Sequence, residues 1–135
     1  MMESMMDRAE AEIVSRHRFF VDWYTGKAPD SAMDTCARTF APDMRMIWPD
    51  ATEHDREPLI ELLRKGKNSH PEDFAIEVDM RHSMQLSPEL VLVTFDEHQN
   101  SNGERNSRRA TAVFSRDDNA PEGVVWRYLH QTWMT

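Results

Sequence analysis

The C-terminal segment from Gly123 to Met134 constrains the fold of this chain more than any other stretch does. At the two-residue period of a β-strand it carries large apolar or aromatic groups on both faces, whereas a half-exposed strand would alternate apolar with charged residues. We therefore expect a strand that is covered on both sides and lies in the interior of a sheet. One face carries Trp126, Tyr128 and His130, and the other carries Leu129, Gln131 and Trp133.

The rest of the chain predicts helices first and strands later. Apolar residues at helical spacing predict helices over residues 3–25, 31–40 and 57–65. A short strand is predicted over 44–48, a polar loop over 50–56, and longer strands over 74–86, 90–99, 108–115 and 123–134. This order is typical of an α+β fold, with three N-terminal helices packed on a curved, mostly antiparallel sheet. The open end of such a cone is a natural pocket.

The bulk properties favour one domain over residues 1–135, long enough for a sizeable core. A net charge of −8 argues against nucleic acid and anionic membranes as partners, because both attract clustered Lys and Arg. The N-terminal residues lack the basic and apolar regions of a secretory signal, and no window approaches the roughly 20 apolar residues of a membrane span. A cytoplasmic location is the resulting expectation.

The cysteine and histidine content predicts neither a disulfide nor a metal site. Cys36 is the single cysteine, so no intrachain disulfide can form. Its apolar neighbours in a predicted helix indicate a buried, inert thiol. The six histidines are scattered, without His-x-x-x-His spacing, so no metal ligand set is expected.

Turn positions predict which side chains share the concave face of the sheet. A tight turn at residues 87–88 sets His82 opposite Val93 and Met80 opposite Phe95. On the same register, Glu97 also points inward. A one-residue slip would exchange the two faces.

The last turn gives the corresponding register for the C-terminal strand. Pairing Phe114 with Trp126 sets Tyr128 and His130 on the concave side, next to small residues that leave room in the middle of the cone. Those small residues are Ala112, beside Tyr128, and Ala110, beside His130.

With these elements in order, the chain resembles the nuclear transport factor 2-like superfamily, also described as SnoaL-like or ketosteroid isomerase-like. The resemblance rests on the element order, on Phe40-Ala-Pro-Asp43 before the first strand, on Leu92-Val-Thr-Phe95, and on the ending over 125–132. The resemblance implies a cystatin-like cone. Within the superfamily, the chain resembles uncharacterised members. None of these segments is a catalytic signature.

The ketosteroid isomerase comparison implies that the catalytic set of those enzymes is missing here. They use a tyrosine near the end of the first helix, where this chain aligns Phe20, with Tyr24 one turn away. Their general base is an aspartate before a proline, and Trp48 holds that position. Their acid on the fourth strand is replaced by Ala110. Phenylalanine cannot donate a hydrogen bond and tryptophan cannot abstract a proton, so steroid isomerase activity is not expected.

The concave face nevertheless holds candidate chemistry. A cluster of His82, Glu97 and His130 in an apolar cup would titrate near physiological pH, which makes these three the catalytic candidates. The alternative is that His130 is a core histidine, with its hydrogen bonds made to Tyr128, a backbone group or water. No cofactor is implied. The predicted ligand-binding residues are Phe20, Tyr24, Trp48, Met80, His82, Phe95, Glu97, Arg108, Phe114, Trp126, Tyr128 and His130.

Two hypotheses about function remain. The first is a protein that binds a small, largely apolar ligand in the cone, with isomerase, dehydratase or cyclase-type turnover left open. The second is a non-catalytic association module with a solid core. Under either hypothesis, no helix is left to cover the convex face of the sheet, so we expect a homodimer through that face. The resemblance implies the same arrangement. The residues assigned to that face are Leu90, Leu92, Thr94, Val113, Leu129 and Trp133.

Overall fold

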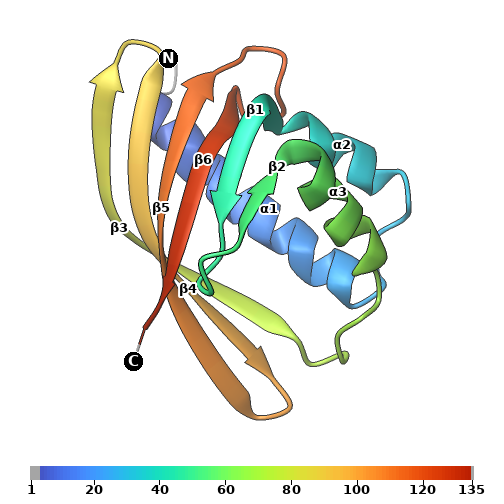
Figure 1. Cartoon of the computed structure of the whole chain (residues 1–135). Coiled ribbons are helices and arrows are strands. Elements are labelled where there is room, and N and C mark those ends of the chain that lie inside the picture. Colours follow the sequence, from blue (N-terminus) through green and yellow to red (C-terminus); the bar gives the residue numbers. More distant parts are fainter. Residues whose placement is uncertain (1–3, 135) are drawn as a thin grey trace.

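A computed structural model describes residues 4–134 as three helices packed on one six-stranded sheet (Figure 1). The helices are α1 (Met5–Tyr24), α2 (Ala32–Arg38) and α3 (Arg56–Lys65). The strands are β1 (Phe40–Ile47), β2 (Glu53–Asp55), β3 (Ala75–Ser87), β4 (Leu90–Ser101), β5 (Glu104–Arg116) and β6 (Val124–Trp133). None of the helices within 4–134 is long and apolar enough to span a membrane.

The sheet order is β2-β1-β6-β5-β4-β3, and neighbouring strands are antiparallel except for the parallel pair β1 and β6. The predicted α+β architecture is therefore confirmed. The interior position of the C-terminal strand is confirmed as well, because β6 lies between β1 and β5. Its first half is buried at Val124, Val125 and Trp126, as a strand covered on both faces requires.

Strand β2 lies within residues 50–56, where the sequence predicts a polar loop, so that prediction is wrong at this strand. It is short and carries no apolar residue, so its sequence lacks the alternation that marks a strand. The pairing with β1 comes instead from backbone hydrogen bonds and from the side chain of Arg45. That guanidinium lies 3.1 Å from Glu53 and 3.3 Å from Asp55.

Helix α1 crosses behind the sheet and forms the roof of the cone (Figure 1). Its start is fixed by Ser4, whose hydroxyl accepts a hydrogen bond from the backbone N–H of Asp7 at 3.0 Å. One face of the helix, including Ala9 and Ile13, is fully buried against the sheet. The helix ends before Gly26, whose positive φ of 79° suits a residue without a side chain.

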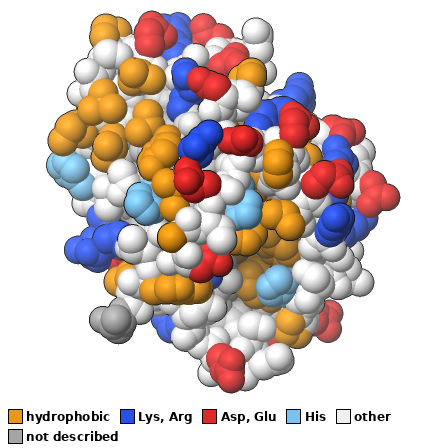
Figure 2. All heavy atoms as spheres, viewed as in Figure 1, with side chains coloured by type: hydrophobic (Ala, Val, Ile, Leu, Met, Phe, Trp, Pro, Cys, Tyr) orange, Lys and Arg blue, Asp and Glu red, His pale blue; other side chains and the backbone are white. Residues whose placement is uncertain are grey.

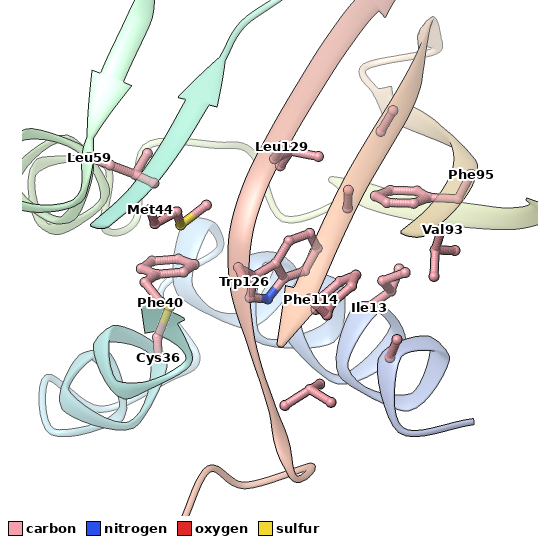
Figure 3. Packing of buried hydrophobic residues seen from close by; sticks show 14 of the residues in the cluster. Ile13, Cys36, Phe40, Met44, Leu59, Val93, Phe95, Phe114, Trp126 and Leu129 are labelled. Carbon is pink, nitrogen blue, oxygen red and sulfur yellow. The ribbon is translucent and has the colours of Figure 1, made fainter. Parts of the chain in front are cut away.

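The narrow half of the cone is filled by side chains (Figure 3). The rings of Trp126 and Phe114 lie 4.5 Å apart between centroids, and Phe95 meets Trp126 edge-on at 6.5 Å. Ile13 packs on them from α1. Cys36 is completely buried as predicted, and burial raises the pKa of its thiol to about 12.

A β-bulge at Arg81 corrects the predicted face of the second half of β3. Met80 pairs with Phe95 as predicted, but His82 pairs with Thr94, so Arg81 is an extra residue. Because side chains alternate, one extra residue moves every later side chain to the other face. His82 therefore lies exposed on the convex face, and its predicted inward orientation is wrong.

A second bulge, at Arg127, has the same effect on β6. Phe114 pairs with Trp126 as predicted, and Val113 pairs with Tyr128, which leaves Arg127 as the extra residue. Tyr128 and His130 accordingly lie on the convex face, with His130 exposed, and their predicted inward orientation is wrong. The residues predicted to face outward here are Leu129 and Trp133, and both lie instead on the face of Trp126 and Arg108.

Candidate functional site

A pocket opens at the wide end of the cone, between the C-terminal half of α1, strand β1, helix α3 and the far ends of β4, β5 and β6. In Figure 2 it is the hollow at lower right, floored by hydrophobic side chains. Its volume of about 130 Å³ is smaller than the roughly 300–1,000 Å³ of typical ligand sites. The lining residues are His17, Phe20, Tyr24, Phe40, Met44, Met46, Trp48, Leu59, Leu63, Ile76, Glu97, Gln99, Arg108, Trp126, Leu129 and Gln131.

A buried ion pair between His17 and Glu97 forms the polar end of this pocket. Nδ1 of His17 lies 2.7 Å from the carbonyl oxygen of Ile13, and Nε2 lies 2.9 Å from a carboxylate oxygen of Glu97. Both neighbours are acceptors, so each ring nitrogen must donate a hydrogen. The ring is therefore an imidazolium, bonded to a carboxylate.

The electrostatics of the pair agree with this assignment. Burial by itself raises the pKa of Glu97, but the charge and hydrogen bond of His17 and the amide of Gln99 outweigh burial and lower that pKa to about 2. Burial conversely lowers the pKa of His17, and the Glu97 charge outweighs it, so the pKa of His17 is raised. Each group stabilises the charged form of the other.

The side-chain amides of Gln99 and Gln131 are oriented by the same carboxylate. Nε2 of Gln99 donates to Glu97 at 2.6 Å, and Nε2 of Gln131 lies 3.5 Å from the other carboxylate oxygen. The reverse orientation would set an amide oxygen against a carboxylate, which is repulsive. Glu97 thus fixes the way in which Gln131 presents its oxygen.

Two buried polar atoms of the pocket lining have no hydrogen-bond partner within residues 4–134. They are Nε of Arg108, a donor, and Oε1 of Gln131, an acceptor. The remainder of the Arg108 guanidinium is held in place, because Nη2 donates to Asn106 at 2.9 Å and the group lies 4.7 Å above the ring of Trp133. Buried polar groups are normally paired, so two unpaired atoms in one pocket mark a binding site.

The side walls of the pocket are aromatic. Phe20 and Tyr24 come from successive turns of α1, and Trp48 follows the end of β1. The indole N–H of Trp48 points at the sulfur of Met46, 3.2 Å away, and its ring lies 4.0 Å from that of His54 between centroids. Burial raises the pKa of Tyr24 to about 12, so its hydroxyl keeps its proton and is able to donate.

The structure brings together half of the residues predicted to bind a ligand. Those that line the pocket are Phe20, Tyr24, Trp48, Glu97, Arg108 and Trp126. Phe95 and Phe114 are completely buried in the solid core, and Met80 packs against that core half-buried. The predicted cluster of His82, Glu97 and His130 does not form, because the two bulges turn both histidines to the convex face.

The polar end of the pocket contains residues that the sequence did not single out. His17 follows Ile13 by four positions and precedes Phe20 by three, so helical spacing alone could have placed it there. Gln99 follows Glu97 by two positions in the same strand and shares its face. Gln131 could not have been found in this way, because its face depends on the bulge at Arg127.

A shallower groove runs along the surface between α1 and β3. Its volume is about 500 Å³, and it is lined by residues such as Val14, Val21 and Val78. His17 borders both the groove and the pocket. The unpaired atoms of Arg108 and Gln131 belong to the pocket, so the pocket is the candidate site.

The cone and its pocket define a nuclear transport factor 2-like fold, and solved structures agree. A nuclear transport factor 2-like protein of unknown function from Pseudomonas aeruginosa is 27% identical and superposes with a TM-score of 0.86, covering 95% of this chain and 99% of that one. A protein from Thiobacillus denitrificans, described as a calcium/calmodulin-dependent protein kinase type II association domain, has a TM-score of 0.66. It is 17% identical and covers 98% and 96% of the two chains, so it shows the fold alone.

The family is more specific than the fold. The family model for the C-terminal region of sucrose-6-phosphate phosphohydrolase matches residues 9–135, and this chain belongs to that family. Among curated proteins, probable sucrose-phosphatase 2 from Arabidopsis thaliana is 25% identical over 125 residues. The match covers 90% of this chain and 29% of that protein, so the chain spans less than a third of its relative.

Proposed function

We propose that this chain is a small-molecule-binding domain whose ligand enters the wide end of the cone. The observation that carries the proposal is the combination of aromatic walls with a buried polar end in one pocket. Ligand sites in proteins are mostly apolar, with a few convergent polar groups that fix orientation. The small enclosed volume of about 130 Å³ indicates a ligand of few atoms, or one that protrudes through the opening.

Binding rather than turnover is the activity that these side chains support. Both ring nitrogens of His17 donate hydrogen bonds, so the ring has no free lone pair, and the pKa of Glu97 is lowered to about 2, so its carboxylate is a weak base. A general base needs a free lone pair and a pKa close to the working pH. The relative named a sucrose-phosphatase is much longer than this chain, and we propose ligand binding, not phosphatase chemistry, for the part that the two share.

Filling the pocket should abolish binding. We expect small ring compounds such as phenol, cyclohexanol or cyclohexanecarboxylate to shift the indole N–H signals of Trp48 and Trp126 in NMR spectra. Met46→Phe places a ring in the cavity and should weaken this binding about tenfold or more. Met84→Phe, on the exposed convex face, is the matched control and should leave it unchanged. Equal binding by both variants, or no shift with any compound, would contradict the proposal.

A second candidate function, association through the convex face, is favoured by a separate observation. Met84 and Leu86 are each 47% exposed on β3, and hydrophobic side chains gather over this part of the sheet at upper left in Figure 2. Large exposed apolar patches usually mark interaction sites. Half-buried residues that extend the patch are Leu90, Leu92, Val113 and Tyr128. We propose a homodimer that packs these faces together.

A charge introduced into this patch should separate the dimer. Leu86→Glu places a carboxylate in the proposed interface and should convert the sedimenting species from dimer to monomer. Leu62→Glu is a matched control, because Leu62 is 42% exposed on α3, away from the patch. A wild-type protein that sediments as a monomer, or two variants that behave alike, would remove this candidate.

A further inference from the structure

The lining of the pocket carries one positive charge that is left without an ion pair. Its charged residues are the cations His17 and Arg108 and the carboxylate Glu97. His17 and Glu97 neutralise each other as an ion pair. Arg108 lies directly opposite Glu97 on the neighbouring strand, but the oxygens of that carboxylate already accept hydrogen bonds from His17 and Gln99. The lining therefore has an excess of one positive charge, on Arg108.

Arg108 also contributes an unpaired donor to this pocket. Its Nε is buried without a hydrogen-bond partner among residues 4–134, whereas its Nη2 donates to Asn106. A buried N–H is normally paired with an acceptor. A hydrogen bond between a guanidinium and a carboxylate is roughly twice as strong as one between neutral groups. A carboxylate on a ligand would thus supply both the missing acceptor and the missing negative charge.

The same charges favour a ligand with a single negative charge. A second negative charge, as on a phosphate monoester, would exceed the charge of Arg108 and would be repelled by Glu97. The net charge of −8 on the whole chain opposes any anion from a distance, but exposed charges are largely screened beyond about 10 Å at 0.1 M salt. The charges inside the pocket therefore decide, and they favour a monoanion.

Gln131 makes the opposite demand on the ligand. Its side chain is 4% exposed, and its Oε1 has no donor among residues 4–134. A carboxylate has no hydrogen to offer, so a separate hydroxyl is needed. Phe20, Tyr24 and Trp48 form the aromatic walls of a small pocket, which favour a small apolar ring. We infer that the pocket binds a hydroxylated ring monocarboxylate of the hydroxybenzoate type, with its carboxylate on Arg108 and its hydroxyl on Gln131. This inference rests on the proposed function and names its ligand class.

The test uses ring compounds that differ in one group. Benzoate, benzamide, phenyl phosphate and the hydroxybenzoate isomers are titrated against the full chain, with the indole N–H signals of Trp48 and Trp126 as the readout. Benzoate should bind about tenfold more tightly than benzamide or phenyl phosphate, because it alone brings a single charge to Arg108. At least one hydroxybenzoate isomer should bind more tightly than benzoate, because its hydroxyl gives Gln131 a donor.

Two variants assign the contacts to their residues. Arg108→Gln removes the positive charge, so benzoate should lose its advantage over benzamide. Gln131→Met keeps the length of the side chain and removes the acceptor, so hydroxybenzoate should lose its advantage over benzoate. Arg105→Gln is the matched control, because Arg105 is an exposed arginine of the same strand that pairs with Glu77. Both preferences should be unchanged in this control.

The outcomes separate this inference from the proposed function. Equal binding of benzoate and benzamide, tighter binding of phenyl phosphate, or a benzoate preference that persists in Arg108→Gln overturns the carboxylate assignment and leaves the pocket as a binding site. Hydroxybenzoates that all bind no better than benzoate overturn the role of Gln131. If Gln131→Met fails to give the wild-type thermal transition, the comparison of isomers on the wild-type chain decides. Failure of every compound to bind, phenol and cyclohexanol included, removes the proposed function as well.

Discussion

Replacing His17 with leucine is expected to lower the free energy of unfolding by about 3–5 kcal/mol near neutral pH, the range seen when one partner of a buried ion pair is removed. His17 and Glu97 are both less than a tenth exposed, so water cannot replace the lost partner. Among residues 4–134, the variant leaves the buried carboxylate with only the amides of Gln99 and Gln131 as donors. Urea unfolding of the two proteins measures the difference.

The pH dependence of this effect has a defined sign. The pKa of His17 is raised above 6.5, so its contribution to stability is complete below that pH and is lost as pH rises through the folded value. The pKa of Glu97 is lowered from 4.5 to about 2, so its contribution is complete above 4.5 and is lost as pH falls towards 2. Both contributions are therefore complete between pH 4.5 and pH 6.5, where the pair stabilises the wild-type chain most. In His17→Leu the deficit should shrink in acid, because protonation neutralises the unpaired Glu97.

The double variant His17→Leu/Glu97→Met provides the control. It removes both charges and fills the space with apolar side chains of similar volume, a change that is often nearly neutral for a buried pair. It should be clearly more stable than His17→Leu alone. Additive losses in the two single variants and the double variant would show that the two groups do not interact energetically.

Sequence patterns predicted the elements of this fold because the patterns are local. Each helix and each long strand carries apolar residues at its own period, and the predicted pairings of Met80 with Phe95 and of Phe114 with Trp126 are both present. The predicted faces are also correct in β3 up to Met80, in β6 up to Trp126, and along β4 and β5. Glu97 and Arg108 were assigned to the pocket for this reason and do line it.

In the part of β3 after Met80 and in the part of β6 after Trp126 the predicted faces are wrong, because the bulges have no local signature. Many bulges are marked by glycine, but here the extra residues are arginines in otherwise regular alternation. Each arginine meets a carboxylate from another strand: Arg81 lies 3.8 Å from Asp96, and Arg127 donates to Asp43 at 2.6 Å. These contacts are tertiary, so a reading of one strand at a time could not include them.

Truncation of Trp126 is expected to cost about 3–5 kcal/mol of stability, the usual range for a large aromatic core residue replaced by alanine. Its side chain is 2% exposed and packs against Phe114 and Phe95. Its indole N–H also donates at 2.8 Å to Glu12, a completely buried carboxylate whose other donor is Arg16. Trp126→Phe keeps most of the volume and should lose less, whereas Trp133→Ala, at a residue 54% exposed, should change stability by at most about 0.5 kcal/mol. Similar midpoints in urea for Trp126→Ala and Trp133→Ala would contradict the central position of Trp126, around which β6, α1 and the closed end of the cone are packed.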